Sequence, residues 1–152
     1  MELWLVRHGE AMSEREDPAR PLTPEGARAV SAVAESLAGK LGTIDLVAAS
    51  GKKRAIQTAA IWAAAAGYPA ARIAETGALS PNAAPEAFLA FLEECPEADR
   101  VLCVGHLPSI AAFASFFLSS GDPVKLVFGP GSVCRIRVET LRRGAGELLL
   151  FV

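Results

Sequence analysis

The chain of 152 residues has little histidine, little cysteine and no long apolar run. Two histidines cannot build a multi-histidine metal site, and we expect neither a metal nor another cofactor. Three cysteines, an odd number, and the lack of an apolar leader favour reduced thiols and a cytoplasmic location. The longest apolar run, Ile110 to Leu118, falls well short of the roughly 20 residues that cross a bilayer, so we expect no membrane partner. With 15 basic and 17 acidic residues, the net charge of −2 also argues against a nucleic-acid partner.

Several common catalytic motifs are missing. A Walker A loop needs a glycine five residues before the pair Gly51-Lys52, where the chain has Leu46. None of the cysteines is followed at the sixth position by the arginine of a thiol phosphatase, and no Gly-x-Ser-x-Gly motif exists for a serine nucleophile. Histidine is therefore the strongest candidate for a nucleophile.

Short apolar runs alternate with segments of helical periodicity along the chain. Thr23 is a good N-cap for a first helix, and Gly67 is a good terminator for a second. The expected helices are Pro24–Leu41, Lys53–Ala66, Pro85–Glu94 and a fourth through Phe117. The expected strands are Glu2–Val6, Ile44–Ala49, Arg72–Ala74, Arg100–Val104, Val124–Phe128, Val133–Val138 and Glu147–Phe151.

This alternation predicts an α/β fold in which helices cover both faces of a mainly parallel sheet, with the last strands forming an antiparallel edge. The length and the hydrophobic content of 51% fit one domain, residues 1–152. In such folds ligands bind beyond the carboxyl ends of the strands. His8, the segment Ser50–Arg54 and His106 each follow an expected strand, so we expect them to converge on one anion-sized site.

The residue types at these strand ends suit phosphoryl chemistry. A neutral imidazole is a competent nucleophile toward phosphorus when its ring is oriented. Arg7, beside His8, offers a planar fork of donors for two phosphoryl oxygens, and Arg54 and His106 would complete a cage of donors. Such a cage acts mainly by positioning and electrostatics.

Four segments, which follow one another along the chain in the family's order, resemble the histidine phosphatase superfamily, also called phosphoglycerate mutase-like. Arg7-His8-Gly9-Glu10 follows the first strand, Ser50 to Thr58 follows the second, and Gly105-His106 follows a later one. Arg20 to Gly26 and His106-Leu107-Pro108 resemble the small SixA-type phosphohistidine phosphatase branch of that superfamily.

The resemblance implies a phospho-enzyme mechanism. By position, His8 matches the nucleophile, Arg7 and Arg54 match the arginines that bind the phosphoryl group, and His106 matches the second histidine. For phosphate binding we also expect contributions from Arg20 and from the N–H of Leu107. Glu10 is a candidate proton donor or orienting residue, with no choice between the two.

Substrate class follows from the leaving group. An alkoxide leaves poorly without a proton donor, whereas imidazole, with a pKa of about 6.5, leaves far more readily. Glu75 and Glu86 are the only carboxylates near the place where larger family members carry an acid, and neither is convincingly placed. We therefore expect a phosphatase acting on a phosphohistidine-containing protein, such as a phosphorelay component in signal transduction.

Two alternatives remain open. One is a phosphatase or mutase acting on a small phosphate monoester. The other is a non-catalytic module that binds phosphate or a phosphoprotein, although such a module has no need of the nucleophile His8.

Overall fold

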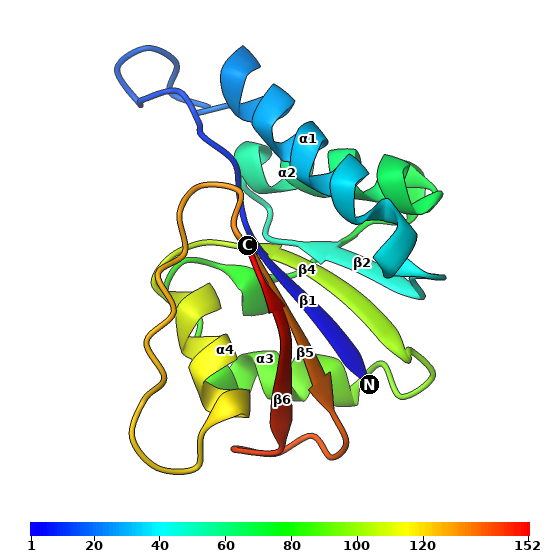
Figure 1. Cartoon of the computed structure of the whole chain (residues 1–152). Helices are drawn as coiled ribbons and strands as arrows, with labels where there is room; N and C mark the ends of the chain where they lie inside the picture. The colour runs from blue at the N-terminus through cyan, green and yellow to red at the C-terminus, as the bar shows by residue number, and fades with distance from the viewer.

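The computed structural model describes residues 1–152, and Figure 1 shows the arrangement of the elements. The strands are β1 Glu2–Arg7, β2 Leu46–Ala49, β3 Ala74–Glu75, β4 Arg100–Gly105, β5 Val133–Val138 and β6 Gly146–Phe151. The helices are α1 Pro24–Leu41, α2 Lys53–Ala66, α3 Pro85–Glu93 and α4 Ser109–Leu118, with short 3₁₀ turns at Ala70–Arg72 and Gly77–Leu79. The expected helices all form, within one residue of their expected ends.

All six strands form one sheet in the order β3-β2-β4-β1-β5-β6. β1, β2, β3 and β4 run parallel, while β5 and β6 add the antiparallel edge that the sequence predicted. This mixed sheet with its helices confirms the predicted α/β fold class. The sheet order also places β1 and β4, which deliver the two histidines, side by side at its centre.

Alternating side chains of β1 divide the core into two layers. Trp4 and Val6 pack in a cluster with buried residues of α1 and α2, such as Trp62. Leu3 and Leu5 pack on the opposite face in a cluster with residues of α3 and α4, such as Phe88 and Phe113. Accordingly α1 and α2 cover one face of the sheet and α3 and α4 the other (Figure 1). None of these helices combines the length and the apolar character that a membrane span requires.

Local signals explain the ends of the helices. The Thr23 hydroxyl accepts a hydrogen bond from the Gly26 N–H at 2.9 Å, and Pro24 occupies the first turn, where its missing N–H costs nothing. α2 ends at Gly67, which adopts the left-handed conformation at φ 65° that glycine allows without a Cβ penalty. These helices are therefore encoded locally as well as by packing.

The prediction of a strand at Val124–Phe128 is wrong. These residues form an irregular segment between α4 and β5. The outer side of β5 is paired with β6, so the sheet has no free ladder beside β5 for another strand. The segment instead follows α4, where the Val124 N–H donates to the Ser115 hydroxyl at 3.0 Å.

Candidate active site

The carboxyl ends of β1, β2 and β4 bring together the residues that the sequence singled out. Arg7 ends β1, and His8 follows it with its N–H bonded to the Gly105 carbonyl of β4 at 3.0 Å. His106 follows β4, and its ring centre lies 5.0 Å from that of His8. Arg54 stands in the first turn of α2, just after β2. The expected convergence of three strand ends is therefore present in the fold.

Hydrogen bonding fixes the proton on the His8 ring. Its Nδ1 lies 2.7 Å from the Gly9 carbonyl oxygen, which only accepts hydrogen bonds, so Nδ1 carries the proton. Burial, together with the positive charges of Arg54, Arg7 and Arg20, lowers the pKa of His8 to about 4, although the Gly9 contact works in the opposite direction. At neutral pH the ring is uncharged and Nε2 holds a free electron pair, as a nucleophile requires.

Ser50 orients the ring of His106. Both side chains are almost fully buried, and Ser50 Oγ lies 2.6 Å from His106 Nε2. Ser50 Oγ also accepts the Lys52 N–H at 3.4 Å, and its own proton has no other acceptor within the chain. The hydroxyl therefore donates to Nε2, which leaves the ring proton on Nδ1.

His106 is held neutral by its surroundings. Burial lowers the pKa of His106 to about 3, assisted by the neighbouring His8 and by the cationic groups of Arg54, Lys52 and Arg20. Its Nδ1–H is thus a neutral donor at physiological pH. Lys52, whose side chain is exposed, is thus one of the charges that act on the site.

Three buried N–H donors of the site have no acceptor within the chain. They are the Nδ1 of His106 and the Nε atoms of Arg7 and Arg54. A buried donor without a partner costs about 1–3 kcal/mol, so a native site that collects three of them is built for an acceptor. Burial also lowers the pKa of both arginines, yet guanidinium stays charged at neutral pH. This combination of donors and charge suits an oxyanion such as a phosphoryl group.

Neighbouring groups hold the arginines and the loop of His8 in place. Arg7 donates from Nη1 to the Phe128 carbonyl at 2.9 Å. The Thr58 hydroxyl, one helical turn after Arg54, donates to the Arg54 carbonyl at 2.8 Å and accepts the Gly9 N–H at 3.1 Å. The sequence contains a signal for Thr58 in the segment that follows the second strand, but none for a backbone carbonyl such as that of Phe128.

Arg20 and Leu107 lie near the site, as expected, and their part in phosphate binding stays a prediction. Arg20 has a positive φ of 47°, donates from Nε to the Met12 carbonyl at 3.1 Å, and contributes charge at both histidines. Leu107, next to His106, has an N–H without a hydrogen-bond acceptor in the chain and a side chain that is 38% exposed.

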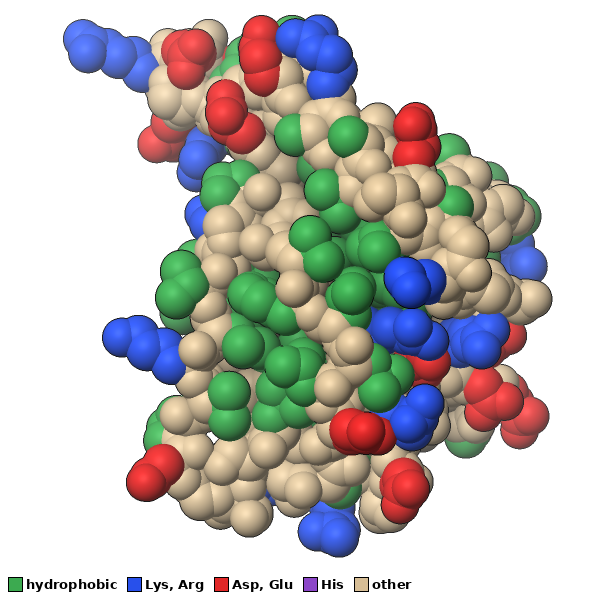
Figure 2. Space-filling model, viewed as in Figure 1, with side chains coloured by type: hydrophobic (Ala, Val, Ile, Leu, Met, Phe, Trp, Pro, Cys, Tyr) green, Lys and Arg blue, Asp and Glu red, His purple; other side chains and the backbone are tan.

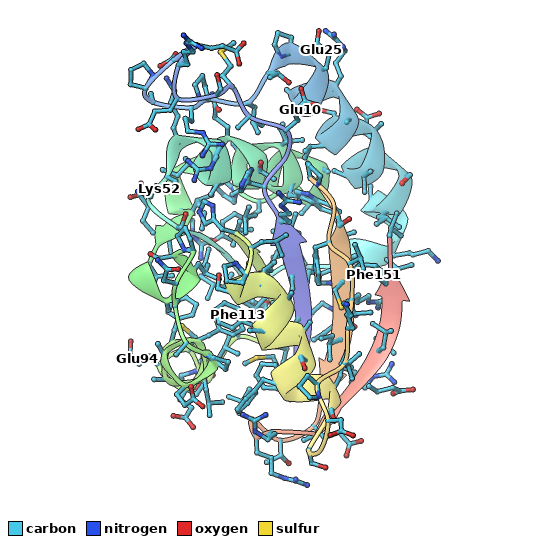
Figure 3. The ribbon with its side chains drawn as sticks, turned by 90° about the vertical axis from the view of Figure 1, so that its left-hand side faces the viewer. Glu10, Glu25, Lys52, Glu94, Phe113 and Phe151 are labelled. Carbon is cyan, nitrogen blue, oxygen red and sulfur yellow. The ribbon has the colours of Figure 1, made fainter.

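The carboxylate of Glu10 is hydrogen-bonded to Thr23 and to neither histidine ring. Its carboxylate accepts a hydrogen bond from the Thr23 hydroxyl at 3.2 Å, and Figure 3 places it beside the beginning of α1. The charges that act on the pKa values of His8 and His106 are all positive. The role of Glu10 as proton donor or orienting residue therefore stays a prediction.

Glu75, another carboxylate, is the last residue of β3, so it lies at the end of the sheet where the site residues converge. Its Oε2 lies 3.6 Å from the position that a Cβ on Gly51 would take. The two buried cysteines offer no alternative nucleophile: burial raises the pKa of Cys134 to about 12 and raises that of Cys103 as well, so neither thiol ionises at neutral pH.

The chain matches a family model described as histidine phosphatase superfamily (branch 1) over residues 3–77. It is 30% identical to a protein of Nakamurella multipartitia named as a SixA phosphohistidine phosphatase, with a TM-score of 0.81, over 99% of this chain and 94% of that one. The chain belongs to the histidine phosphatase superfamily. Within the superfamily it falls on the SixA-type branch. The family that the motifs predicted is therefore confirmed, and so is the predicted enzyme class, a phosphatase.

Two further structures share the fold. The protein histidine phosphatase SixA in complex with tungstate has a TM-score of 0.87 and 22% identity, over 100% of this chain and 96% of that one. The α-ribazole phosphatase of Shigella flexneri has a TM-score of 0.74 and 17% identity, over 99% and 96% of the two chains.

A shorter similarity joins part of the chain to a different class of protein. A stretch of 61 residues is 41% identical to GMP reductase of Yersinia enterocolitica, covering 39% of this chain. The match spans only 18% of the length of that enzyme.

Proposed function

We propose that this histidine phosphatase hydrolyses N-phosphohistidine on a protein, through a phosphorylated His8. The observation that carries the proposal is the state of the His8 ring. Its Nδ1–H is bound to the Gly9 carbonyl, and its Nε2 is free beside the cationic groups of Arg7 and Arg54. Among the groups of the site, this nitrogen is the one prepared to attack phosphorus.

The first step transfers the phosphoryl group to His8. The Nε2 electron pair forms a bond to phosphorus while the phosphorus–nitrogen bond of the substrate breaks. When the substrate ring is protonated on its other nitrogen, it leaves as neutral imidazole. Arg7, Arg54 and the Nδ1–H of His106 supply donors for the phosphoryl oxygens, whose charge is greatest in the transition state.

The second step restores the enzyme. Water attacks phosphorus opposite Nε2, the bond to His8 breaks, and the electron pair returns to Nε2. Both protons of the water leave with the phosphate as dihydrogen phosphate, so the Nδ1–H of His8 is unchanged throughout. No metal takes part in either step of the proposed mechanism.

The positive surroundings of the histidines favour phosphohistidine over an alkyl phosphate. An alkoxide leaving group needs a proton from an acid, whereas an imidazole with a pKa of about 6.5 takes its proton from water before it leaves. The charged groups that act on His8 and His106 are arginines and a lysine, which are poor acids at neutral pH. The naming of two similar structures as SixA phosphohistidine phosphatases supports the same choice.

The partner that we propose is a phosphohistidine-containing protein of a cytoplasmic phosphorelay, which would place the enzyme in signal transduction. The test is to trap the phospho-enzyme. A histidine-phosphorylated protein labelled with ³²P is mixed with the enzyme, and the reaction is quenched in alkali, where phosphohistidine survives. We expect label on the wild-type chain that is lost on acidification, and none on His8→Ala.

Rates on sugar phosphates and the binding of tungstate, measured alongside, separate the alternatives. Faster turnover of sugar phosphates than of the phosphoprotein would identify a small-ester phosphatase or mutase. Tungstate binding without any label on the wild-type chain would identify a non-catalytic binding module. His8→Ala that still releases phosphate at the wild-type rate would overturn the proposal.

A further inference from the structure

An exposed apolar segment runs beside the active site. It consists of residues Pro123–Val127, and we refer to it as the 123–127 segment. Val127 is 78% exposed and is the most exposed large hydrophobic side chain of the protein. The next residue, Phe128, is buried and accepts the hydrogen bond from Arg7. The segment therefore ends one residue before the carbonyl group that holds Arg7 of the site.

The backbone of this segment is free to pair with another chain. The N–H groups of Lys125, Leu126 and Val127 donate to no acceptor in the protein. The outer side of β5 is already paired with β6, so these N–H groups cannot form hydrogen bonds to β5. A peptide that docks by strand pairing forms hydrogen bonds with unpaired backbone groups, and its side chains pack against exposed apolar residues beside them.

A groove of about 380 Å³ lies between this segment and α4. The charged side chains that line it are both basic, Lys125 and Arg143. In Figure 2 hydrophobic side chains gather on the face that includes this part of the molecule. Its apolar lining includes Ala111, Ala112 and Phe116 of α4 and Pro123, Val124 and Leu126 of the segment. The groove is therefore apolar and positively charged, and complements a chain that is apolar and acidic.

A second exposed apolar side chain borders the site next to His106. Leu107 is 38% exposed and precedes α4, in which Ala111 and Ala112 line the groove. Leu107 is thus the neighbour of His106, and Val127 is the neighbour of Phe128, whose carbonyl holds Arg7. Exposed apolar side chains at such positions contact whatever surrounds the phosphoryl group of the substrate.

We propose that the 123–127 segment and its groove bind the stretch of polypeptide that flanks the phosphohistidine of the substrate, and select an acidic, apolar sequence there. The inference rests on the proposed function, because only a protein substrate carries such a stretch. Val127 supplies apolar contact, Lys125 supplies charge, and the free N–H groups supply backbone hydrogen bonds.

The test uses two synthetic peptides that each contain one N-phosphohistidine. In the first it is flanked by leucine and glutamate, and in the second every glutamate is replaced by lysine. Free N-phosphohistidine serves as the small substrate. For the wild-type enzyme we expect kcat/KM to be about tenfold higher on the glutamate peptide. Lys125→Glu should erase or reverse this preference, and Val127→Ser should raise KM for both peptides.

Two exposed control positions accompany these variants. Leu148→Ser changes an exposed apolar side chain on β6, and Lys40→Glu changes an exposed cation at the end of α1. Both should act like the wild type, and all four variants should hydrolyse free N-phosphohistidine at the wild-type rate. The docking surface would be refuted if the wild-type enzyme had the same kcat/KM on the two peptides. It would also be refuted if the control variants changed the kinetics as much as Lys125→Glu and Val127→Ser do.

Failure of the proposed function has a different signature. In that case no phosphohistidine substrate is hydrolysed, including the free amino acid derivative. Binding of the two phosphopeptides, followed by fluorescence anisotropy, then still tests the surface. Tighter binding of the glutamate peptide that depends on Lys125 supports it, and equal binding of the two peptides overturns it.

Discussion

The hydroxyl of Ser50 lies 2.6 Å from Nε2 of His106, and this contact determines which nitrogen of that ring carries a proton. With Ser50 as donor, the proton of His106 is on Nδ1, the nitrogen that lacks an acceptor within the chain. In the proposed mechanism Ser50 is thus a positioning residue, because it acts on a phosphoryl oxygen through His106.

Ser50→Ala should release the His106 ring to exchange between its two neutral tautomers. We expect kcat to fall by about 10- to 100-fold, the range seen when a residue that orients a catalytic ligand is removed. The direct measurement is the ¹⁵N NMR spectrum of histidine-labelled protein, in which only two rings contribute. The His106 signals should move from a pure Nδ1–H pattern toward a mixture.

Ser50→Thr keeps a hydroxyl and should restore both the spectrum and most of the activity. His8 is the internal reference, since its Nδ1 contact with Gly9 does not involve Ser50. Unchanged His106 signals in Ser50→Ala, with activity lost, would show that the serine has a merely structural role.

Arg54→Ala should lower kcat/KM by about 10²–10³, the effect of removing one donor that binds charge in a transition state. It should not lower the melting temperature. Arg54 has no ion-pair partner, and a cation in the first turn of a helix is unfavourable by a few tenths of a kcal/mol. Steady-state kinetics and calorimetry measure the two effects.

Lys53→Ala is the matched control for Arg54, because Lys53 is the preceding residue and is exposed. Arg7→Ala should reduce kcat/KM to a similar degree, and it should also reduce stability, since it breaks the bond to the Phe128 carbonyl. An Arg54→Ala variant as active as Lys53→Ala would remove Arg54 from the site.

Protonation of His8 should lower the activity only in acid and not near neutrality. The pKa of His8 is about 4, so protonation blocks Nε2 only as the pH approaches that value. The acid limb of the kcat/KM profile measures this pKa. An acid limb centred near pH 6.5 would show that the site does not hold His8 neutral.

Stability should respond to pH over a different range. The pKa values of both histidines are lower in the folded chain than the ordinary 6.5, so the unfolded chain binds more protons between these values. Stability is therefore full above pH 6.5 and is lost progressively as the pH falls toward 4 and then 3. Urea midpoints should show this loss in the wild type, and a weaker one in the double variant His8→Asn, His106→Asn.

Two glycines of α1 should respond in opposite ways to replacement by alanine. A Cβ on Gly26 would meet the Glu10 carbonyl oxygen, so we expect Gly26→Ala to destabilise the fold by about 1–3 kcal/mol. Gly39, in the same helix, has open space at this position, and Gly39→Ala should stabilise by about 0.5–1 kcal/mol. Denaturant titrations measure both, and equal effects would contradict the close approach of Glu10.

Much of this fold is encoded in short stretches of sequence. The helix Lys53–Ala66 forms with the predicted ends, because apolar spacing and Gly67 act locally. The two-residue β3 gave a weaker signal and lies one to two residues from its predicted place. Val124–Phe128 has the composition of a strand, but its conformation depends on whether the neighbouring edge is free, and β6 occupies that edge.

The same division applies to the site. His8 and His106 were found because each directly follows an apolar strand, and parallel strands bring such positions together. The Ser50 contact and the Phe128 carbonyl depend on the packing of segments that are far apart in the chain, 56 and 121 residues respectively. A backbone carbonyl also has no residue type by which a sequence could reveal it.

The two histidines extend from the central pair of strands, where Arg7 of β1 lies in register with Gly105 of β4. Partial opening begins at edges and termini, and β1 is enclosed on both sides by β4 and β5. The distance between the two rings consequently persists through fraying of β3 or β6. Loss of catalytic geometry and global unfolding become one event, so thermal inactivation should track the main unfolding transition with no earlier step.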